Sequence, residues 1–283
     1  MPNTPSPAVR FVGAVKSILP AQLHSFARRL WRWCYARVQD LPEVKLYLEY
    51  WLFRLKGGTY LQWYASTLDR WVESRDPEFL AKKRAVLVSS GSEDVEVLKS
   101  FGMRPDSTLH EFGCGQLRSA LHFVEYLAPG NFSANDASKG RIDLGLELFG
   151  DRIRPRNPAL IVNPDNGFDW LKGRKFDFIW CHAVLGHMPA EDIEDTVRDV
   201  RKAMHANSMF LFTYDEPRAH FLDAKEDVVR VDSRNFYQSA DFYRKLASKY
   251  GYQFADVSEA IRPFKSYHQF FRLGKMTLLP PGR

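Results

Sequence analysis

The stretch Ser107-Thr-Leu-His-Glu-Phe-Gly-Cys-Gly-Gln-Leu-Arg118 decides the fold of this chain. It predicts a short buried strand, a glycine-rich turn and a helix, because apolar residues lead into Gly113-Cys-Gly115 and then recur at helical spacing up to Leu127. A glycine turn between a strand and a helix lets a ligand approach backbone atoms that side chains would otherwise cover. We therefore expect a ligand site at this turn.

Beyond this stretch, apolar strand candidates alternate with helices. The strand candidates are 108–112, 131–135, 159–163, 176–181, 208–214, 252–258 and 267–273, and the clearest helices are 117–127, 189–205 and 239–250. Continuous apolar strands separated by helices are typical of a parallel sheet that is covered on both faces. The last two candidates are close enough in sequence to form an antiparallel hairpin at one edge. Residues 107–283 are thus predicted to be an α/β domain with a mostly parallel seven-stranded sheet and helices on both faces.

The residues before this domain are helical in pattern and show no strand signal. Residues 1–20 contain four prolines and are predicted to be loose. Residues 21–106 predict helices over 21–38, from Pro42 to Gly57-Gly58, over 59–75, from Asp76-Pro77 onward and over 92–101. Each helix needs its apolar face covered, so we expect 21–106 to be a helical cap or lid on the sheet and not an independent domain.

The net charge of +6 is concentrated at the N-terminus. Residues 1–39 contain six basic side chains and no acidic one, so the remaining 34 basic side chains are matched by 34 acidic ones. A neutral main domain argues against a nucleic-acid partner. The predicted helix 21–38 carries its arginines on one side and apolar residues on the other, which suits peripheral contact with a membrane surface or an acidic partner. An ordinary helix that packs on the domain explains the same pattern.

Cysteine usage and hydropathy favour a cytoplasmic protein. Cys34, Cys114 and Cys181 are far apart in sequence and form no CxxC pair, so neither a disulfide framework nor a zinc site is expected. No apolar run approaches the roughly 18 residues of a membrane span. Lys16 interrupts the one short apolar stretch near the N-terminus, which makes a signal peptide a poor interpretation.

The residues at the carboxyl ends of the predicted strands favour a nucleoside ligand that carries an amino acid. Asp136 lies 21 residues beyond Gly115 at the end of the next strand, where a carboxylate accepts hydrogen bonds from a ribose diol. Glu111 lies just before the turn, which is unfavourable beside a pyrophosphate and favourable beside an α-ammonium group. Arg118 occupies the position at which the dinucleotide fingerprint GxGxxG requires its third glycine.

These motifs give residues 108–216 a specific resemblance. Glu111-Phe-Gly-Cys-Gly115, Asp136 and the fourth-strand region from Phe176-Asp177 to Leu185-Gly-His-Met-Pro189 resemble the motifs of Rossmann-like class I S-adenosylmethionine-dependent methyltransferases. Many members have a third glycine where this chain has Leu117, and Gly115-Gln-Leu-Arg118 is similar to the members with a GCG-x-LR form. The resemblance implies that S-adenosylmethionine is the cofactor. It implies cofactor contacts for Glu111, Gly113, Cys114, Gly115, Asp136, Ala137, Asp165, Asn166, Gly167 and Cys181.

Candidates for the chemistry follow the fourth and fifth strands. Methyl transfer needs two oriented partners and, for a hydroxyl acceptor, a general base. His182 follows the fourth strand and is the candidate base, although a structural histidine explains the position equally well. The candidates for acceptor contact or lid closure are Tyr60, Trp63, Tyr64, His187 and Asp215. Packing explains the three aromatic ones at least as well, a structural role explains His187 better, and an exposed loop before Pro217 explains Asp215 better. His182 and His187 do not have HExxH spacing, and no metal site is expected.

The sequence therefore predicts an S-adenosylmethionine-dependent methyltransferase that acts on a small molecule, a sugar or glycan precursor, or a lipid-linked intermediate. Oxygen is the preferred nucleophile. A non-catalytic cofactor-binding module that docks through the basic N-terminal helix is one alternative hypothesis. An NAD-dependent oxidoreductase is the other, less favoured because of Glu111 and Arg118.

Overall fold

The computed structural model describes residues 42–73, 77–165, 167–215, 236–265, 267 and 271–280. Contacts divide the chain into two compact units, one of residues 1–63 with 230–234 and one of residues 64–229 with 235–283. The predicted helix 21–38 and its membrane contact lie outside the described residues. Within the described ranges, no helix is long and apolar enough to cross a membrane.

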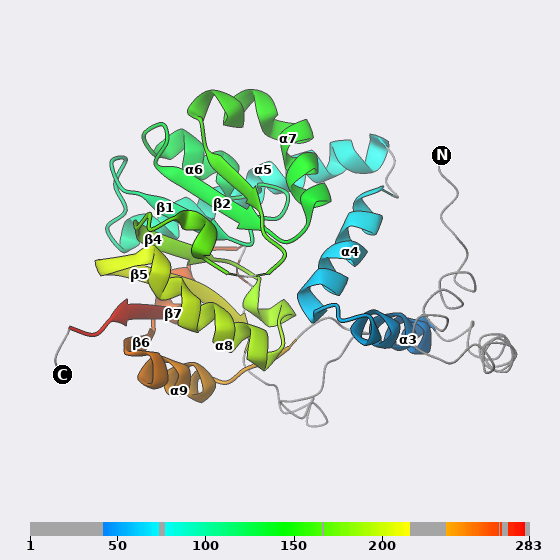
Figure 1. Ribbon diagram of the computed structural model, residues 1–283. Coiled ribbons are helices and arrows are strands. Elements are labelled where there is room, and N and C mark those ends of the chain that lie inside the picture. Colours follow the sequence, from blue (N-terminus) through cyan, green and yellow to red (C-terminus); the bar gives the residue numbers. More distant parts are fainter. Residues whose placement is uncertain are drawn as a thin grey trace, which may run out of the picture. The chain divides into compact units, whose positions relative to one another are not determined.

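The second unit is built on one seven-stranded sheet (Figure 1). Its strands lie in the order β3-β2-β1-β4-β5-β7-β6. They are β1 (Leu109–Phe112), β2 (Phe132–Asp136), β3 (Ala159–Val162), β4 (Phe176–Cys181), β5 (Met204–Asp215), β6 (Tyr252–Asp256) and β7 (Phe271–Leu278). The first five strands pair in parallel, and β7 is antiparallel to both β5 and β6. The predicted mostly parallel sheet with an antiparallel edge is confirmed.

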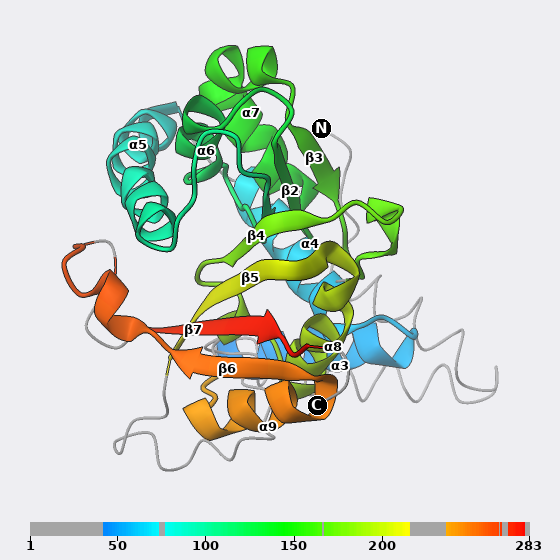
Figure 2. The ribbon, with the colours of Figure 1, turned by 90° about the vertical axis from the view of Figure 1, so that its left-hand side faces the viewer.

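Helices cover both faces of this sheet (Figure 2). One layer contains α5 (Pro77–Ser100), α6 (Ala120–Tyr126) and α7 (Lys139–Ile153), and the other contains α8 (Ala190–Asp199) and α9 (Ala240–Tyr250). Side chains alternate between the two faces, so Leu109 and Trp180 enter one apolar core while Phe112 and Ile179 enter the other. Strands buried on both faces explain why the sequence shows continuous apolar runs there.

The first unit contributes α3 (Pro42–Leu55) and the first turn of α4 (Tyr60–Glu73) to the described residues. Tyr50 of α3 makes edge contacts with Tyr60 and Trp63, with ring centroids 5.8 and 5.3 Å apart. The boundary between the units falls within α4, between Trp63 and Tyr64. The predicted cap 21–106 is therefore shared between the two units, and α5 lies in the same unit as the sheet.

Several predicted bounds differ from the structure for local reasons. Helix α5 is continuous from residue 77 to residue 100, where the sequence predicts a break before residue 92. Helix α6 begins at Ala120 and not at residue 117, because Leu117 takes a left-handed backbone conformation with φ 60°. Strand β7 ends at Leu278, five residues later than predicted. Strand β4 spans residues 176–181 as predicted.

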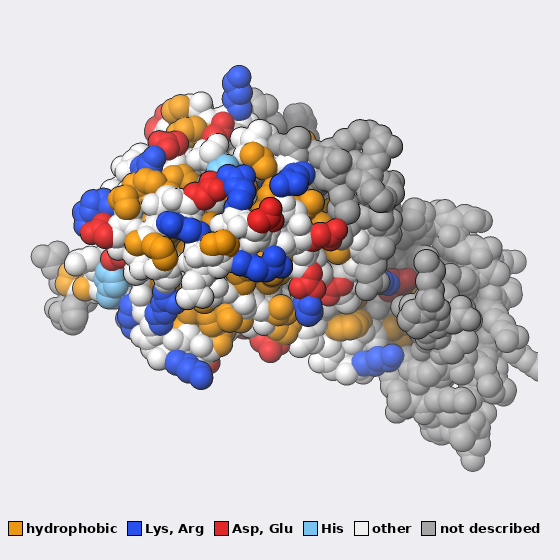
Figure 3. Space-filling view, turned by 90° about the horizontal axis from the view of Figure 1, so that it is seen from above, with side chains coloured by type: hydrophobic (Ala, Val, Ile, Leu, Met, Phe, Trp, Pro, Cys, Tyr) orange, Lys and Arg blue, Asp and Glu red, His pale blue; other side chains and the backbone are white. Residues whose placement is uncertain are grey.

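The surface agrees with the balanced charge of the main domain. In the view of Figure 3, acidic, basic and apolar side chains are interspersed over the described residues.

Candidate functional site

The turn after β1 is built by two glycines with positive φ. Gly113 has φ 78° and Gly115 has φ 54°, which glycine adopts without the steric cost that a side chain adds. A Cβ at Gly113 would collide with the Val184 side chain, and one at Gly115 would collide with the Arg141 guanidinium. The N–H groups of Gly113 and Cys114 both donate to the carbonyl of Asn135, at 2.8 and 2.9 Å, which fixes the turn against β2.

Leu117 and Gly145 together replace the missing third glycine of this turn. Leu117 is fully buried despite its left-handed φ of 60°. A Cβ added at Gly145 of α7 would collide with the Leu117 side chain and with the backbone of Gln116. In this chain, the glycine that permits close contact between the turn and a helix lies on the facing helix.

Asp136 closes the turn from the end of β2. Its Oδ2 accepts from the Gly115 N–H and its Oδ1 accepts from the Ser138 N–H, both at 2.8 Å. Each carboxylate oxygen has a second lone pair, so Asp136 keeps the capacity to accept hydrogen bonds from a ribose diol. The adjacent Ala137 joins it to Ser138, whose side chain caps α7 by accepting from the Arg141 N–H.

Glu111 brings a buried carboxyl group to the start of the turn. Its side chain is 4% exposed, and its Oε2 has no hydrogen-bond partner among the residues that the structure describes. Burial, and next the charge of Asp94, raise the pKa of Glu111 to about 8. A buried polar atom without a partner costs free energy, so it marks a position at which a ligand group fits.

The loop after β3 approaches Asp136 from the other side. The Asn163 N–H donates to the Asp136 carbonyl at 2.9 Å, and Asn163 Nδ2 donates to the Gly167 carbonyl at 2.8 Å. Asp165 lies in the turn between them and is exposed, while Asn166 lies outside the described residues. Two of the three predicted cofactor contacts in this loop, Asp165 and Gly167, are therefore near the predicted ribose-binding acid.

The two buried cysteines are not poised for thiol chemistry. Cys114 and Cys181 are both free and buried. Burial raises the pKa of each thiol well above its usual value, which keeps both neutral. The Cys181 side chain packs in the core between the sheet and α8–α9, so the backbone is the part of Cys181 that remains for a cofactor contact.

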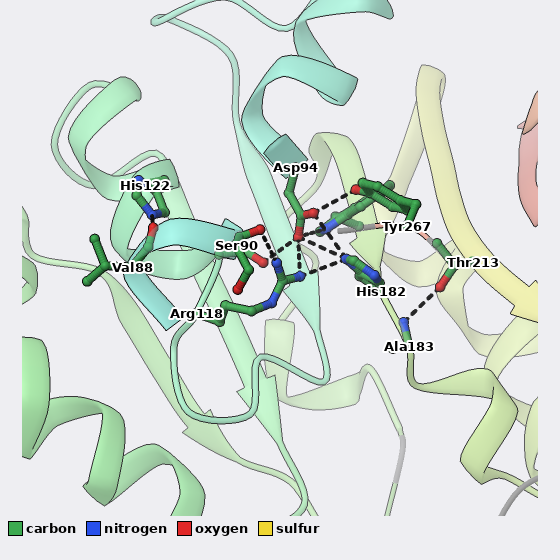
Figure 4. A network of polar contacts seen from close by, with 11 residues as sticks. Val88, Ser90, Asp94, Arg118, His122, His182, Ala183, Thr213 and Tyr267 are labelled. Carbon is green, nitrogen blue, oxygen red and sulfur yellow. Dashed lines mark hydrogen bonds and ion pairs between the residues drawn. The ribbon is translucent and has the colours of Figure 1, made fainter. Parts of the chain in front are cut away.

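His182 lies in a buried polar network centred on Asp94 of α5 (Figure 4). Its Nδ1 is 3.1 Å from both Asp94 carboxylate oxygens and 2.7 Å from Arg118 Nη2, and its ring stacks on Tyr267 at 4.7 Å. Asp94 also accepts from Arg118 at 2.6 Å, from Tyr267 at 2.6 Å, from Trp180 at 3.2 Å and from Ser119. A proton on Nδ1 would donate to Asp94 and leave Nε2 as the basic nitrogen.

The acceptor candidates separate into two groups. The Tyr64 ring stacks on the His187 ring at 5.8 Å, so these two lie together beyond β4. Asp215 ends β5 nearby, since a Cβ at Gly186 would lie 4.0 Å from Asp215 Oδ2. Tyr60 and Trp63 lie in the first unit with Tyr50.

Several residues that the structure brings to this site could not be predicted as site residues from sequence motifs. Asp94 is fully buried on the apolar face of α5, at helical spacing from Leu87 and Leu98. An acid on such a face is itself a signal, because a buried carboxylate needs donors from elsewhere in the chain. Asp69 of α4 accepts from Ser138 Oγ and from the Gly140 N–H, at 2.6 and 2.8 Å. No pattern in the sequence indicates that pairing.

Gln238 is a further buried polar side chain near the acceptor candidates. It is 2% exposed, and within the described ranges neither its Nε2 nor its Oε1 has a hydrogen-bond partner. Two residues earlier, the Phe236 N–H donates to the Gly186 carbonyl at 2.6 Å, which holds this segment against the loop after β4. In the part of the chain that the structure describes, no group of histidine, cysteine or acidic side chains could hold a metal ion.

Known proteins resemble this chain in two respects: one family model matches part of its sequence, and several solved structures share its fold. Residues 110–210 match the family model of a methyltransferase domain. Magnesium protoporphyrin IX methyltransferase from Synechocystis PCC 6803 with bound SAM is 15% identical, with a TM-score of 0.50 over 75% of this chain and 91% of that one. The DhpI–SAH complex is 15% identical, with a TM-score of 0.50 over 78% and 95%. A putative O-methyltransferase from Nostoc punctiforme is 9% identical, with a TM-score of 0.53 over 72% and 62%.

Proposed function

We infer that this chain, which carries a methyltransferase domain of class I fold, is an S-adenosylmethionine-dependent methyltransferase. The observation that carries the inference is the unpartnered Oε2 of buried Glu111 beside a glycine turn that Asp136 closes. A pyrophosphate would meet the repulsion of that acid, while an amino-acid ammonium group would satisfy it. The family match over residues 110–210 and the solved methyltransferases of the same fold support the same cofactor.

The residues present fit this cofactor. Glu111 would bind its ammonium group, the backbone of the Gly113–Gly115 turn would accommodate its methionine portion, and Asp136 would accept from its ribose. Asp165 and Asn166 are the proposed adenine contacts, and Cys181 would contribute backbone. When bound, the cofactor supplies a methyl group on an electrophilic sulfonium.

The acceptor would approach from the loops after β4 and β5. There, Tyr64 and His187 present a stacked pair of rings, and Asp215 and Gln238 present polar groups. We place a small molecule, a sugar or glycan precursor, or a lipid-linked intermediate in this position, with an oxygen nucleophile. The chain's contribution is to orient the acceptor and exclude water, which accounts for much of the rate of a displacement reaction.

His182 is the proposed base for a hydroxyl acceptor. Asp94 orients the ring through Nδ1, so Nε2 would take the proton of the hydroxyl. His182→Ala should lower turnover and leave the affinity for S-adenosylmethionine unchanged. Full turnover by a folded His182→Ala protein would show that the histidine is only structural.

Calorimetric titration of the full-length chain with S-adenosylmethionine and, separately, with NAD tests the proposed function. We expect the first ligand to bind and the second to give no heat of binding. Binding of NAD with no response to S-adenosylmethionine would overturn the proposal. Formation of S-adenosylhomocysteine that depends on an added acceptor would separate an enzyme from a non-catalytic binding module.

A further inference from the structure

In the described part of the chain, Glu111 has no counter-charge of its own. The basic side chain that faces it is Arg118, and this guanidinium already donates to Asp94 Oδ2 and to the Ser90 carbonyl, both at 2.6 Å. The Ser119 hydroxyl lies within hydrogen-bond range of both acids but has a single proton, which it donates to Asp94. The donors around the two carboxyl groups are therefore committed to Asp94.

The other groups that face Glu111 oppose its ionisation. Asp94 of α5 and Asp136 at the end of β2 are both acidic, and both raise its pKa. The thiols of Cys114 and Cys181, on the turn and on β4, are also within electrostatic range and are neutral. An ionised carboxylate that is nine-tenths buried and has no partner for one oxygen is costly, so the neutral form is favoured.

We propose that Glu111 carries a proton in the ligand-free protein and releases it to solvent when the ammonium group of the cofactor binds. This rests on the proposed function, because it takes S-adenosylmethionine as the ligand. The carboxylic acid becomes a carboxylate, the proton goes to the buffer, and the positive charge of the ligand replaces it in the buried site. The ligand therefore supplies the counter-charge that the folded chain lacks.

The exchange makes cofactor affinity depend on pH in a defined direction. Below a Glu111 pKa of about 8, binding must displace a proton, so affinity should rise about tenfold per pH unit between pH 6 and 7.5. The α-amino group of the ligand loses its own proton near pH 8, so affinity should fall again above that pH. Glu111→Gln keeps the shape of the side chain and removes the proton exchange, so its affinity should be weak and flat over pH 6 to 7.5.

Isothermal titration calorimetry counts this proton directly. The full-length chain is titrated with S-adenosylmethionine at pH 6.5 in phosphate, PIPES and imidazole buffers, whose ionisation enthalpies differ. We expect the measured heat to depend on the buffer with a slope of about one released proton per site, because over nine-tenths of Glu111 is protonated at that pH. The matched control ligand is 5′-methylthioadenosine, which keeps the adenosine portion and lacks the amino acid, and which should bind without releasing a proton.

The outcomes separate this inference from the proposed function. Heats of S-adenosylmethionine binding that are independent of the buffer would overturn the proton exchange and leave the methyltransferase proposal standing. Absence of binding in every buffer would overturn the proposed function, and this inference with it. Infrared difference spectra of the wild-type protein give a second test that needs no variant. The carboxylic acid C=O band of Glu111 should disappear on addition of S-adenosylmethionine, and its persistence would contradict the proposal.

Discussion

Two carboxyl groups, those of Asp94 and Glu111, lie buried on the same side of the sheet. The surrounding chain supplies hydrogen-bond donors to Asp94 but, among the described residues, leaves one oxygen of Glu111 without a donor. Asp94 is fully buried and accepts hydrogen bonds from Arg118, Ser119, Trp180 and Tyr267. Burial alone would raise its pKa, but the electrostatic interactions and hydrogen bonds with His182 and Arg118 outweigh burial and hold the pKa well below its usual range. Glu111 is 4% exposed, and one of its oxygens has no partner.

This difference separates structure from function. All the hydrogen-bond donors to Asp94 come from the chain itself. Such an acid stabilises the fold, because four segments of the chain meet at it. A buried acid that lacks a donor destabilises the ligand-free fold and is satisfied by a ligand.

Asp94→Asn should cause the largest loss of unfolding free energy. Removing the negative charge leaves the Arg118 guanidinium buried without its counter-ion, which costs about 3–5 kcal/mol of unfolding free energy in comparable sites. Urea denaturation measures the loss. The matched control is Asp106→Asn, which removes an exposed acid paired with Arg104 and should cost less than about 1 kcal/mol. Equal losses for the two variants would show that the Asp94 network is not a structural centre.

Asp136→Ala should weaken S-adenosylmethionine binding by about 1–3 kcal/mol, because the ribose hydroxyls would lose their acceptor. The variant also frees the N–H groups of Gly115 and Ser138, so its thermal stability is recorded beside its affinity. Calorimetric titration gives the affinity. Unchanged affinity in a folded variant would place the ribose elsewhere.

The pH dependence of ligand-free stability should report Glu111. Its folded pKa of about 8 is above the ordinary glutamate pKa of 4.5, so its favourable contribution to the unfolding free energy is present at low pH and is lost as pH rises from 4.5 to 8. Buried His110 has a lowered pKa of about 4 and acts in the opposite direction between pH 4 and 6.5, which masks the lower half of this window.

The change in unfolding free energy between pH 6.5 and 8 therefore reports Glu111 without the contribution of His110. Wild-type unfolding free energy should fall by about 2 kcal/mol over that interval, and Glu111→Gln should remove this loss. Urea titrations of both proteins at the two pH values provide the comparison. Parallel pH profiles for the wild type and the variant would contradict the assignment of a buried, protonated Glu111.

Gln238→Leu should change the unfolding free energy least, and it should raise this free energy where Asp94→Asn lowers it. Both amide atoms of Gln238 are buried without partners, so an apolar side chain of similar size should raise the unfolding free energy by about 1 kcal/mol. If the amide contacts the acceptor, the same variant should lower turnover. A loss of stability would show that Gln238 makes contacts that hold the fold.

The fold was predictable because its signals are local. The apolar run of β4, the glycine turn after β1 and the acid at the end of β2 are each contained in a few residues, and their spacing implies a parallel sheet. The antiparallel edge followed from the short connection between the last two strands. Bounds that depend on tertiary contacts were predicted less well, as in α5, where a continuous helix includes Gly91 because the Arg118 backbone approaches it closely.

The site was only partly predictable because half of it depends on long-range pairs. Asp94 and Arg118 are 24 residues apart, and Asp94 and Tyr267 are 173 apart, so no motif links them. The close contact between Gly145 and Leu117 also depends on the packing of α7 against the turn, which the sequence does not indicate. Glu111 was singled out from the sequence because it precedes the glycine turn, but the absence of a partner for its Oε2 among the described residues is a property of the folded chain.

The most direct test of the central claim compares two ligands on two proteins. The affinities of S-adenosylmethionine and 5′-methylthioadenosine are measured by calorimetry for the wild type and for Glu111→Gln. Since truncating one partner of a buried charge pair costs about 2 kcal/mol or more, the variant should bind S-adenosylmethionine about 30-fold or more weakly, and 5′-methylthioadenosine equally well. Equal losses for both ligands, or no loss for either, would contradict the claim that Glu111 binds the cofactor's ammonium group.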